Sequence, residues 1–297
     1  MDKPAGVTSA DVVARLKRRL GGAKVGHTGT LDPFATGVMV CCVNRATKLA
    51  RFFLTGVKTY EATLCLGIET DTQDPTGRVT ATGDTGSLSE STVLAALSQF
   101  KGDLLQAPPV FSALKHQGTP LYKLARSGHP VQKPPRPVHI SAIDVIKMAL
   151  PDVVFSVTCS AGTYIRTLCA DIGCVLGCGG HLKALRRVES CGFSIDESIR
   201  LDDLDDLAAS GDIWGRMVSM GKALRHIPPV VVDSGLAEHI LQGRKLTRQG
   251  LGLTEGIDLT GYIKVVDTHH HLLAVLRAEG DAITYGCVFP RRQDDPL

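Results

Sequence analysis

The chain has 297 residues, 43% of them hydrophobic, and a formal net charge of +3 at pH 7. The apolar content excludes a disordered chain and is enough for a sizeable core. The small positive charge excludes a protein as basic as a histone, but it permits a nucleic acid partner.

A first helix is predicted after Thr8 or Ser9, either of which can cap it. Its apolar side holds Val12, Val13, Leu16 and Leu20, and its other side is mostly basic, with Arg15, Lys17, Arg18 and Arg19. The basic side is either solvated or faces RNA. After Gly21-Gly22 ends this helix, a Gly-rich segment with the sequence GHTGTLDPFATG runs from 26 to 37.

Strands and helices follow one another in the middle of the chain. Residues 58–66 alternate as a half-buried strand, with Tyr60, Ala62, Leu64 and Leu66 on one face. Helices are predicted at 91–100, 119–127 and 163–176, and strands at 138–147 and 152–159. The helix at 119–127 would have Thr119 as its cap and Pro120 at its first position. Because the elements interleave without regular βαβ spacing, we predict an α+β fold with a central mixed or antiparallel sheet flanked by helices.

The texture of the sequence changes at about residue 228. A strand and a short helix are followed by strand-like runs at 260–266, 271–277 and 282–289. We therefore predict two domains, one at 1–227 and a small β-rich one at 228–297. The histidine triplet 269–271 lies between two of these runs and indicates a hairpin turn.

The cysteines and histidines do not indicate a bound group. The sequence holds 9 cysteines, no signal peptide, and no stretch with the roughly 18 apolar residues of a membrane helix. We therefore expect reduced thiols in a cytoplasmic protein without membrane contact. Cys169, Cys174, Cys178 and His181 match no usual zinc spacing, and the first two fall on an apolar helical stripe. We expect no metal and no cofactor.

Asp32 is the one carboxylate in the Gly-rich segment 26–37. Pro33 follows it and restricts it to an extended or turn backbone. Loops with rigid flanks often carry catalytic groups, but an aspartate in a turn can equally serve to bind local backbone amides. The residues alone leave both explanations open.

Short motifs are spread over nearly the whole chain. In order they are KPAGVTS (3–9), GHTGTLDPFATGV (26–38), KTYEA (58–62), TDTQDPTG (70–77), PPVFSALKHQGTPLYKLARSG (108–128), GTYIRTLCADIG (162–173) and GGHLKALRR (179–187). Their sequences and their order resemble the tRNA pseudouridine-55 synthase family, TruB, and the motif at 26–38 resembles the signature of that family. The resemblance implies the pseudouridine synthase fold with a small C-terminal PUA-like β-barrel that binds RNA. It also implies an apolar strand before Asp2, so either the true start lies upstream or that edge strand is absent.

The resemblance further implies the isomerisation of a uridine in the T-loop of tRNA to pseudouridine, without a cofactor. Asp32 would be the nucleophile; whether it attacks the sugar or the base, or assists elimination, stays open. Because burial would raise the pKa of Asp32, a nearby cation must compensate, and the resemblance points to Arg166, which could bind the carboxylate through two nitrogens. Tyr60 would lie against the flipped uracil and could accept a proton.

Four more residues are implied as contacts of the substrate: His27, Tyr164, Leu185 and Lys115. Tyr164 would touch the flipped nucleotide or hold the Asp–Arg pair, and Leu185 would form an apolar wall or simply belong to the core. The segment 112–140 resembles an insertion that closes on the T-loop. Its basic residues suit phosphate contacts: Lys115, His116, Lys123, Arg126, Lys133 and Arg136.

The expected partner is tRNA, bound through its T-stem-loop and acceptor side by a monomer that needs no protein partner. One alternative is a guide-RNA-dependent relative of the dyskerin type. The 112–140 segment and the ending RRQDDPL, which is not a basic tail, argue against it. Another alternative is a non-catalytic RNA-binding or RNA-folding protein, which the joint presence of Asp32, Tyr60 and Arg166 disfavours.

Overall fold

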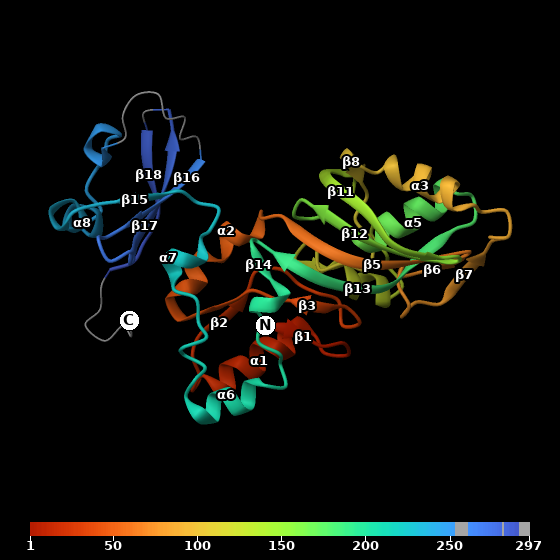
Figure 1. The fold of residues 1–297 in the computed structure, drawn as a ribbon, viewed down its shortest axis with the longest axis horizontal. Helices are drawn as coiled ribbons and strands as arrows, with labels where there is room; N and C mark the ends of the chain where they lie inside the picture. Colours follow the sequence, from red (N-terminus) through yellow and green to blue (C-terminus); the bar gives the residue numbers. More distant parts are fainter. Residues whose placement is uncertain (253–260, 281, 291–297) are drawn as a thin grey trace. The chain divides into compact units, whose positions relative to one another are not determined.

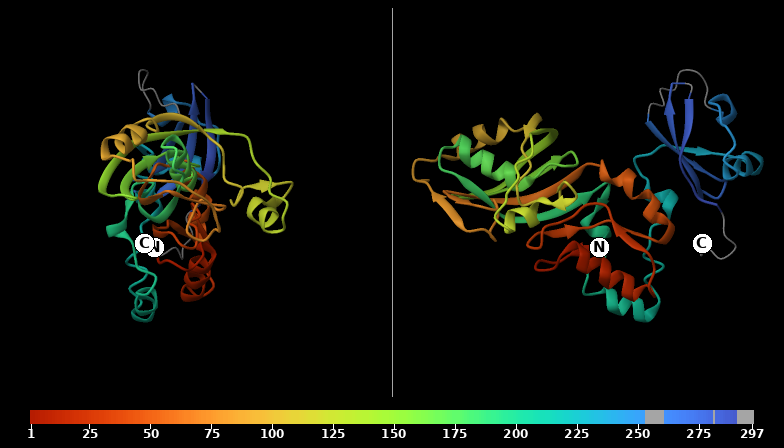
Figure 2. Two further views of the ribbon diagram at one scale, coloured as in Figure 1. Left: turned by 90° about the vertical axis from the view of Figure 1, so that its right-hand side faces the viewer. Right: turned by 180° about the vertical axis from the view of Figure 1, so that it is seen from behind.

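The computed structural model describes residues 1–252, 261–280 and 282–290, so residue 260 and the ending RRQDDPL lie outside the described ranges. The chain divides into two compact units. The first contains residues 1–16, 27–41 and 54–203, and the second contains residues 17–26, 42–53 and those from 204 onward. Figures 1 and 2 show the ribbon. In the described ranges, none of the helices has the length and hydrophobicity to cross a bilayer.

An eight-stranded sheet forms the frame of the first unit. Its strands are β1 (Asp2–Lys3), β3 (Thr36–Val38), β5 (Lys58–Leu66), β8 (Gly102–Gln106), β11 (Arg136–Ala149), β12 (Asp152–Cys159), β13 (Gly180–Ser190) and β14 (Phe193–Ser194). They run in the order β1-β3-β13-β5-β12-β11-β8, and β14 pairs with β13. Only β3 and β13 are parallel, so the sheet is mixed, as predicted. The edge strand β1 starts at Asp2 and pairs with β3.

Two helices, α3 (Glu90–Ser98) and α5 (Ile165–Val175), pack on one face of this sheet (Figure 1). Val93 and Leu97 of α3 and Leu168 and Ile172 of α5 share a core with Phe155 of β12 and its neighbours. Both helices confirm the predicted segments to within two residues at most ends. The predicted apolar stripe is only partly right, because Cys169 is buried whereas Cys174 is exposed.

The segment 112–140 differs from its prediction. A hairpin of β9 (Lys115–His116) and β10 (Thr119–Pro120) precedes the short helix α4 (Leu121–Arg126). The predicted helix start at Thr119 is therefore wrong. Gln117 and Gly118 both have positive φ, 47° and 83°, and this pair of angles makes the two-residue turn that favours a hairpin. Figure 2, left, shows α4 projecting away from the sheet.

The first helix, α1 (Ser9–Arg19), confirms its prediction, and Thr8 caps it because the Thr8 hydroxyl accepts a hydrogen bond from the Asp11 amide at 3.1 Å. The remaining short elements connect the larger ones. They are β2 (Val25–His27), β4 (Cys41–Val43), α2 (Ala50–Leu54), β6 (Ile68–Thr70), β7 (Val79–Thr82) and the 3-10 turns Asn44–Leu49, Ile195–Glu197 and Gln249–Leu251. β2 pairs with β4, and β6 pairs with β7.

From residue 204 onward, the described part of the second unit forms a four-stranded sheet and the helices α6, α7 and α8. The strands follow the order β15 (Pro229–Val231), β16 (Gly261–Val266), β17 (Leu272–Glu279) and β18 (Ala282–Val288), and the helices are α6 (Leu204–Ser210), α7 (Met220–Ala223) and α8 (Ser234–Leu241). The histidine triplet lies in the β16–β17 hairpin, as predicted, where the Asp267 carboxylate accepts the backbone amides of His269 and His271, both at 2.9 Å. The expected closed barrel is not seen among the described strands, because β15 pairs only with β16 and β18 only with β17.

Candidate active site

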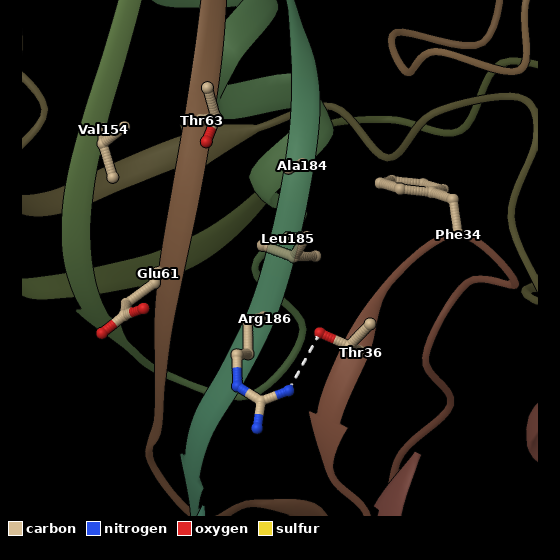
Figure 3. A pocket seen from close by; sticks show the side chains of 8 residues that line it. All are labelled: Phe34, Thr36, Glu61, Thr63, Val154, Ala184, Leu185 and Arg186. Atoms are coloured by element: carbon tan, nitrogen blue, oxygen red, sulfur yellow. Dashed lines mark hydrogen bonds between the residues drawn. The ribbon is translucent and has the colours of Figure 1, made fainter. Parts of the chain in front are cut away.

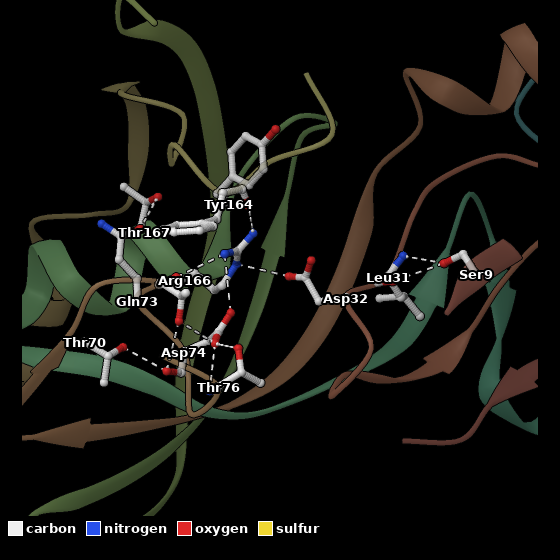
Figure 4. A network of polar contacts seen from close by, with 12 residues as sticks. Ser9, Leu31, Asp32, Thr70, Gln73, Asp74, Thr76, Tyr164, Arg166 and Thr167 are labelled. Carbon is white, nitrogen blue, oxygen red and sulfur yellow. Dashed lines mark hydrogen bonds and ion pairs between the residues drawn. The ribbon is translucent and has the colours of Figure 1, made fainter. Parts of the chain in front are cut away.

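The backbone on both sides of Asp32 is held by side chains from the start of the chain, and Figure 4 shows the contact between Ser9 and Leu31. Before it, the Ser9 hydroxyl accepts the Leu31 amide at 2.9 Å and donates to the Leu31 carbonyl at 3.1 Å. After it, the carbonyl of Pro33 accepts a hydrogen bond from Lys3 Nζ at 3.1 Å. Because both neighbours are fixed, the fold sets the position of the Asp32 backbone.

Arg166, the second residue of α5, points its guanidinium at this carboxylate. Its Nε lies 3.1 Å from Asp32 Oδ2, and the side chain of Arg166 is only 6% exposed while that of Asp32 is 37% exposed. The other nitrogens donate elsewhere, Nη1 to the Thr72 carbonyl at 3.0 Å and Nη2 to the Phe111 carbonyl at 2.8 Å. The expected two-nitrogen contact with Asp32 is therefore not formed, because carbonyls of two other loops occupy the remaining donors.

A second carboxylate, Asp74, also contacts Arg166, and sequence analysis missed it. Its Oδ2 lies 3.4 Å from Arg166 Nη1, and its Oδ1 accepts the hydroxyls of Thr72 and Thr76 at 2.7 and 2.6 Å. The side chain is 6% exposed, and it belongs to the loop between β6 and β7. The signal available was the clustering of threonines around an acidic residue at 70–77, which is also typical of an ordinary turn.

The electrostatics of Asp32 reflect opposing influences. Burial raises the pKa of the Asp32 carboxyl above its ordinary value, the Arg166 charge lowers it, the Asp74 charge raises it and the Lys3 charge lowers it. The expectation that Arg166 offsets burial is correct in direction, but burial has the larger effect. A carboxylate with a raised pKa is a better base and nucleophile than a free aspartate, because both properties rise with basicity.

Tyr60 lies on β5, the strand between β13 and β12, and is 7% exposed. It stands directly across from Val157 on one side and Arg187 on the other. Burial raises the pKa of its phenol, and the Arg187 charge and hydrogen bond lower it without reversing that direction. The phenol is therefore protonated near neutral pH, and in that state it donates a hydrogen bond more readily than it accepts a proton.

Tyr164 immediately precedes α5 and lies two residues before Arg166 in the chain. Gln106 brackets its backbone, because the Gln106 side chain accepts the Tyr164 amide at 2.7 Å and donates to the Tyr164 carbonyl at 3.1 Å. The guanidinium of Arg136 lies 5.3 Å from the centre of the Tyr164 ring and also donates to the Gly162 carbonyl. Arg136, one of the residues predicted to contact phosphates, thus also supports Tyr164. Gln106 had no sequence signal of its own.

His27 and Lys115 occupy different surroundings. His27 is half-buried beside the Asp32 loop, and its Nδ1 accepts the Gly29 amide at 3.3 Å. Burial, followed by the Arg187 charge, lowers the pKa of His27, so its ring is neutral and Nε2 carries the proton. Lys115 is exposed on β9, in the projecting hairpin, and does not contact Asp32 or Arg166.

Leu185 borders a pocket of about 260 Å³ (Figure 3). The pocket is lined by Phe34, Thr36, Glu61, Thr63, Val154, Ala184, Leu185 and Arg186. Leu185 also packs against the main core, and it lies across the pocket from Phe34, which closely follows Asp32 in the chain. Asp32, Tyr60 and Arg166 do not line this pocket, and its residues Glu61 and Thr63 lie on the opposite face of β5 from Tyr60, so the pocket is not part of the acidic site.

The cysteine–histidine cluster does not converge on one point. His181 Nδ1 bonds the Ile68 carbonyl at 2.9 Å, and Cys174 is exposed while Cys169 and Cys178 are buried. Within the ranges that the structure covers, no three or more His, Cys, Asp or Glu side chains are grouped so that they could hold a metal ion.

The geometry can be compared with known families. Residues 17–165 match the model of the TruB family pseudouridylate synthase N-terminal domain, and residues 166–226 match that of the tRNA pseudouridylate synthase B C-terminal domain. The chain belongs to the TruB family. Asp32 and Arg166 come from the two matched regions, so both of them contribute to the site.

Curated relatives agree with the TruB assignment over most of the chain. The tRNA pseudouridine synthase B of Burkholderia mallei (strain NCTC 10247) is 43% identical over 278 residues, 94% of this chain and 91% of that protein. The protein of the same name from Geobacter sulfurreducens is 44% identical over 265 residues, 87% of each chain.

The fold of this chain is similar to that of more distant proteins whose structures have been solved. A chain in the crystal structure of a Cbf5-Nop10-Gar1 complex matches with a TM-score of 0.76 and 28% identity, covering 97% of this chain and 82% of that one. A chain in the structure of an H/ACA RNP bound to a substrate RNA containing 2'-deoxyuridine matches with a TM-score of 0.76 and 27% identity, covering 99% and 85%. The predicted pseudouridine synthase fold with a mixed sheet is confirmed.

Proposed function

We propose that this chain converts the uridine at position 55 in the T-loop of tRNA to pseudouridine. The observation that carries the proposal is the contact between Asp32 and Arg166, 3.1 Å apart, in a chain that belongs to the TruB family. The curated relatives at 43% and 44% identity bear the name tRNA pseudouridine synthase B, which supports tRNA as the substrate.

The reaction is an isomerisation that needs no outside reactant. The bond between N1 of uracil and C1′ of ribose breaks, the base turns, and C5 bonds to C1′; the C5 hydrogen leaves as a proton and N1 gains one. Asp32 is the group that engages the sugar or the base while they are apart, by attack or by assisting elimination. Its raised pKa, maintained by burial, suits either role.

The neighbouring residues have supporting roles in this proposal. Arg166 keeps Asp32 charged and oriented, and the buried Asp74 anchors Arg166 from another nitrogen. Tyr60 lies against the flipped uracil with a protonated hydroxyl, while His27, Tyr164 and Leu185 contact the extruded nucleotide or its surroundings. No cofactor or metal takes part.

Binding must supply the few kcal/mol that extruding a nucleotide costs. The projecting segment 112–140 is the proposed clamp on the T-loop, with Lys115 and its basic neighbours on phosphates. Residues 1–227 form the catalytic domain. Residues 228–297 form a PUA-like RNA-binding domain, and their four-stranded sheet contacts the acceptor side of tRNA. The chain acts as a cytoplasmic monomer.

The guide-RNA-dependent alternative rests on the likeness to the Cbf5 and H/ACA structures, at 27% to 28% identity. The relatives named tRNA pseudouridine synthase B are more similar, at 43% to 44%, and the projecting 112–140 segment fits direct tRNA binding. A non-catalytic RNA-binding protein would have no need of the buried Arg166–Asp74 pair beside Asp32, because a buried ion pair is costly to maintain.

The Asp32→Asn variant tests the proposal, with Asp103→Asn as the matched control, because Asp103 is 92% exposed on β8. We expect Asp32→Asn to lose pseudouridine formation while the Kd for tRNA changes by less than about tenfold, roughly 1.4 kcal/mol. The control should keep both. Full activity in Asp32→Asn, or an equal collapse of tRNA binding, would contradict the proposed role. Mapping of pseudouridine in total RNA with and without the protein tests the substrate.

A further inference from the structure

Arg187 is a fully buried cation on the same strand as Leu185, and the proposed reaction does not account for it. It is 1% exposed, among the largest completely buried side chains of the described residues. No carboxylate of the described part of the chain lies within ion-pair distance of it, and its guanidinium donates to the backbone carbonyls of Gly29 and Val38. A buried guanidinium without a counter-ion costs free energy that an apolar residue would not, so its presence needs a reason.

The two carbonyls that Arg187 binds lie on opposite arms of the Asp32 loop. Nη2 donates to the Gly29 carbonyl at 3.1 Å, before Asp32, and Nε donates to the Val38 carbonyl at 2.6 Å, after it. One rigid, planar group therefore spans the base of the loop and sets the distance between its arms. A flexible ammonium could not hold both acceptors in this fixed geometry.

The Asp32 loop packs closely around Arg187. The backbone of Arg187 pairs in parallel with that of Gly37, and a Cβ atom at Gly37 would lie 2.2 Å from the Arg187 carbonyl oxygen. A Cβ atom at Gly29 would lie 3.5 Å from Arg187 Nη1. The glycines of the family signature thus bring the loop against the strand that carries Arg187.

Arg187 also reaches the residue opposite the loop. It stands directly across from Tyr60 in the β13–β5 ladder, so the two side chains share a face of the sheet, and its guanidinium interacts with the Tyr60 hydroxyl. The neighbouring Arg186 pairs with Glu61 on the other face and bonds Asp2 at 2.9 Å. Of the two adjacent arginines, only Arg187 touches both the Asp32 loop and Tyr60.

We propose that Arg187 is a positioning residue, which fixes the spacing of the Asp32 loop and sets it against Tyr60. Because it is buried, it does not touch the RNA, and its effect is on the rate of the chemical step and not on tRNA affinity. This inference rests on the proposed function, since it assigns a role within that reaction. A displacement of about 1 Å in a reacting group is enough to slow a reaction by about 100-fold.

The test compares Arg187→Lys with Arg78→Lys, the same change at a side chain that is 95% exposed. Tritium release from tRNA labelled at C5 of uridine gives the single-turnover rate with enzyme in excess, and filter binding gives the Kd for tRNA. We expect Arg187→Lys to react about 100-fold more slowly with a Kd within about threefold of the parent. Arg78→Lys should stay within about twofold of the parent in both measurements.

The fraction of folded protein is measured by circular dichroism and by the stoichiometry of tRNA binding, and rates are corrected for it. Arg187→Gln, which keeps a hydrogen-bond donor but not the charge or the fork, serves as a second variant and should also be slow. An unchanged rate, or a rate and an affinity that fall together, would overturn the inference. If neither variant folds, Arg187 serves the core as a whole, and that result also overturns it. A parent protein without activity would refute the proposed function instead.

Discussion

The carboxylate of Asp74 lies 3.4 Å from Nη1 of Arg166, at a different nitrogen from the one that contacts Asp32. The guanidinium therefore lies between two carboxylates, one buried and one partly open. Because the Asp74 side chain is 6% exposed and also bonds Thr72 and Thr76, it is the fixed end of this arrangement. Asp32, 37% exposed, is the end that can meet a substrate.

The first prediction concerns this fixed end. In Asp74→Asn the amide group faces the Arg166 guanidinium, so a favourable contact becomes a repulsive one. We expect activity to fall about 10- to 100-fold and the free energy of unfolding to fall by about 1–3 kcal/mol. Because the Asp74 charge raises the pKa of Asp32, the acid limb of the pH–rate profile should move to lower pH. Asp71→Asn, in the same loop, is the control, and an equal loss there would contradict the assignment.

The second prediction concerns Arg166→Lys. Lysine keeps the positive charge but cannot reach Asp32 and the carbonyls of Thr72 and Phe111 together. We expect the single-turnover rate to fall by about 100-fold or more, because the direction of the Asp32 carboxylate is no longer fixed. Tritium release measures the rate, with the 95% exposed Arg78→Lys as the control. A rate near that of the parent would show that charge alone suffices.

The third prediction follows from Lys3, which holds the Pro33 carbonyl. Burial lowers the pKa of Lys3 to about 8 from the value of 10.5 for a free lysine. Between these values the unfolded chain binds more protons than the folded one, so the contribution of Lys3 to stability rises with pH across that window. The free energy of unfolding of the parent, relative to Lys3→Met, should therefore increase by about 1 kcal/mol or more above pH 8. Urea unfolding on both sides of pH 8 measures it, and a constant difference would contradict the prediction.

The fourth prediction concerns the projecting segment 112–140. If its basic side chains contact phosphates, the logarithm of the tRNA affinity should fall linearly with the logarithm of the salt concentration. Lys115→Gln should reduce the magnitude of the slope of that line by about 1, because one phosphate contact is lost. Lys147→Gln, an exposed change on β11, is the control. An unchanged slope in Lys115→Gln would show that Lys115 does not contact a phosphate.

The sequence alone predicts those helices and strands that have strong local signals. The alternation at 58–66 predicted β5, and the cap at Thr8 predicted the start of α1, because both signals depend on neighbours in the chain. The helix predicted at 119–127 forms as α4, but it begins two residues later because the positive φ angles of Gln117 and Gly118 make a hairpin that takes up Thr119 and Pro120. Gln-Gly is a weaker turn signal than Asn-Gly, so the sequence does not indicate this hairpin.

The site was harder to predict because its contacts are between distant segments. The pairing of Asp32 with Arg166 came from the family resemblance, and no spacing in the chain indicates it. No sequence signal indicates a role for Asp74 or Arg187, because an aspartate among threonines and an arginine beside another arginine are both typical of solvated surfaces. Only the tertiary structure shows that these two side chains are buried.

The position of β13 in the sheet has a consequence for protein synthesis. This strand comes late in the chain, yet it is the link between β3, which ends the Asp32 loop, and β5, which carries Tyr60. A nascent or prematurely terminated chain that stops before residue 180 lacks β13 and cannot join the two. Such a product is therefore inert, however well its earlier segments fold.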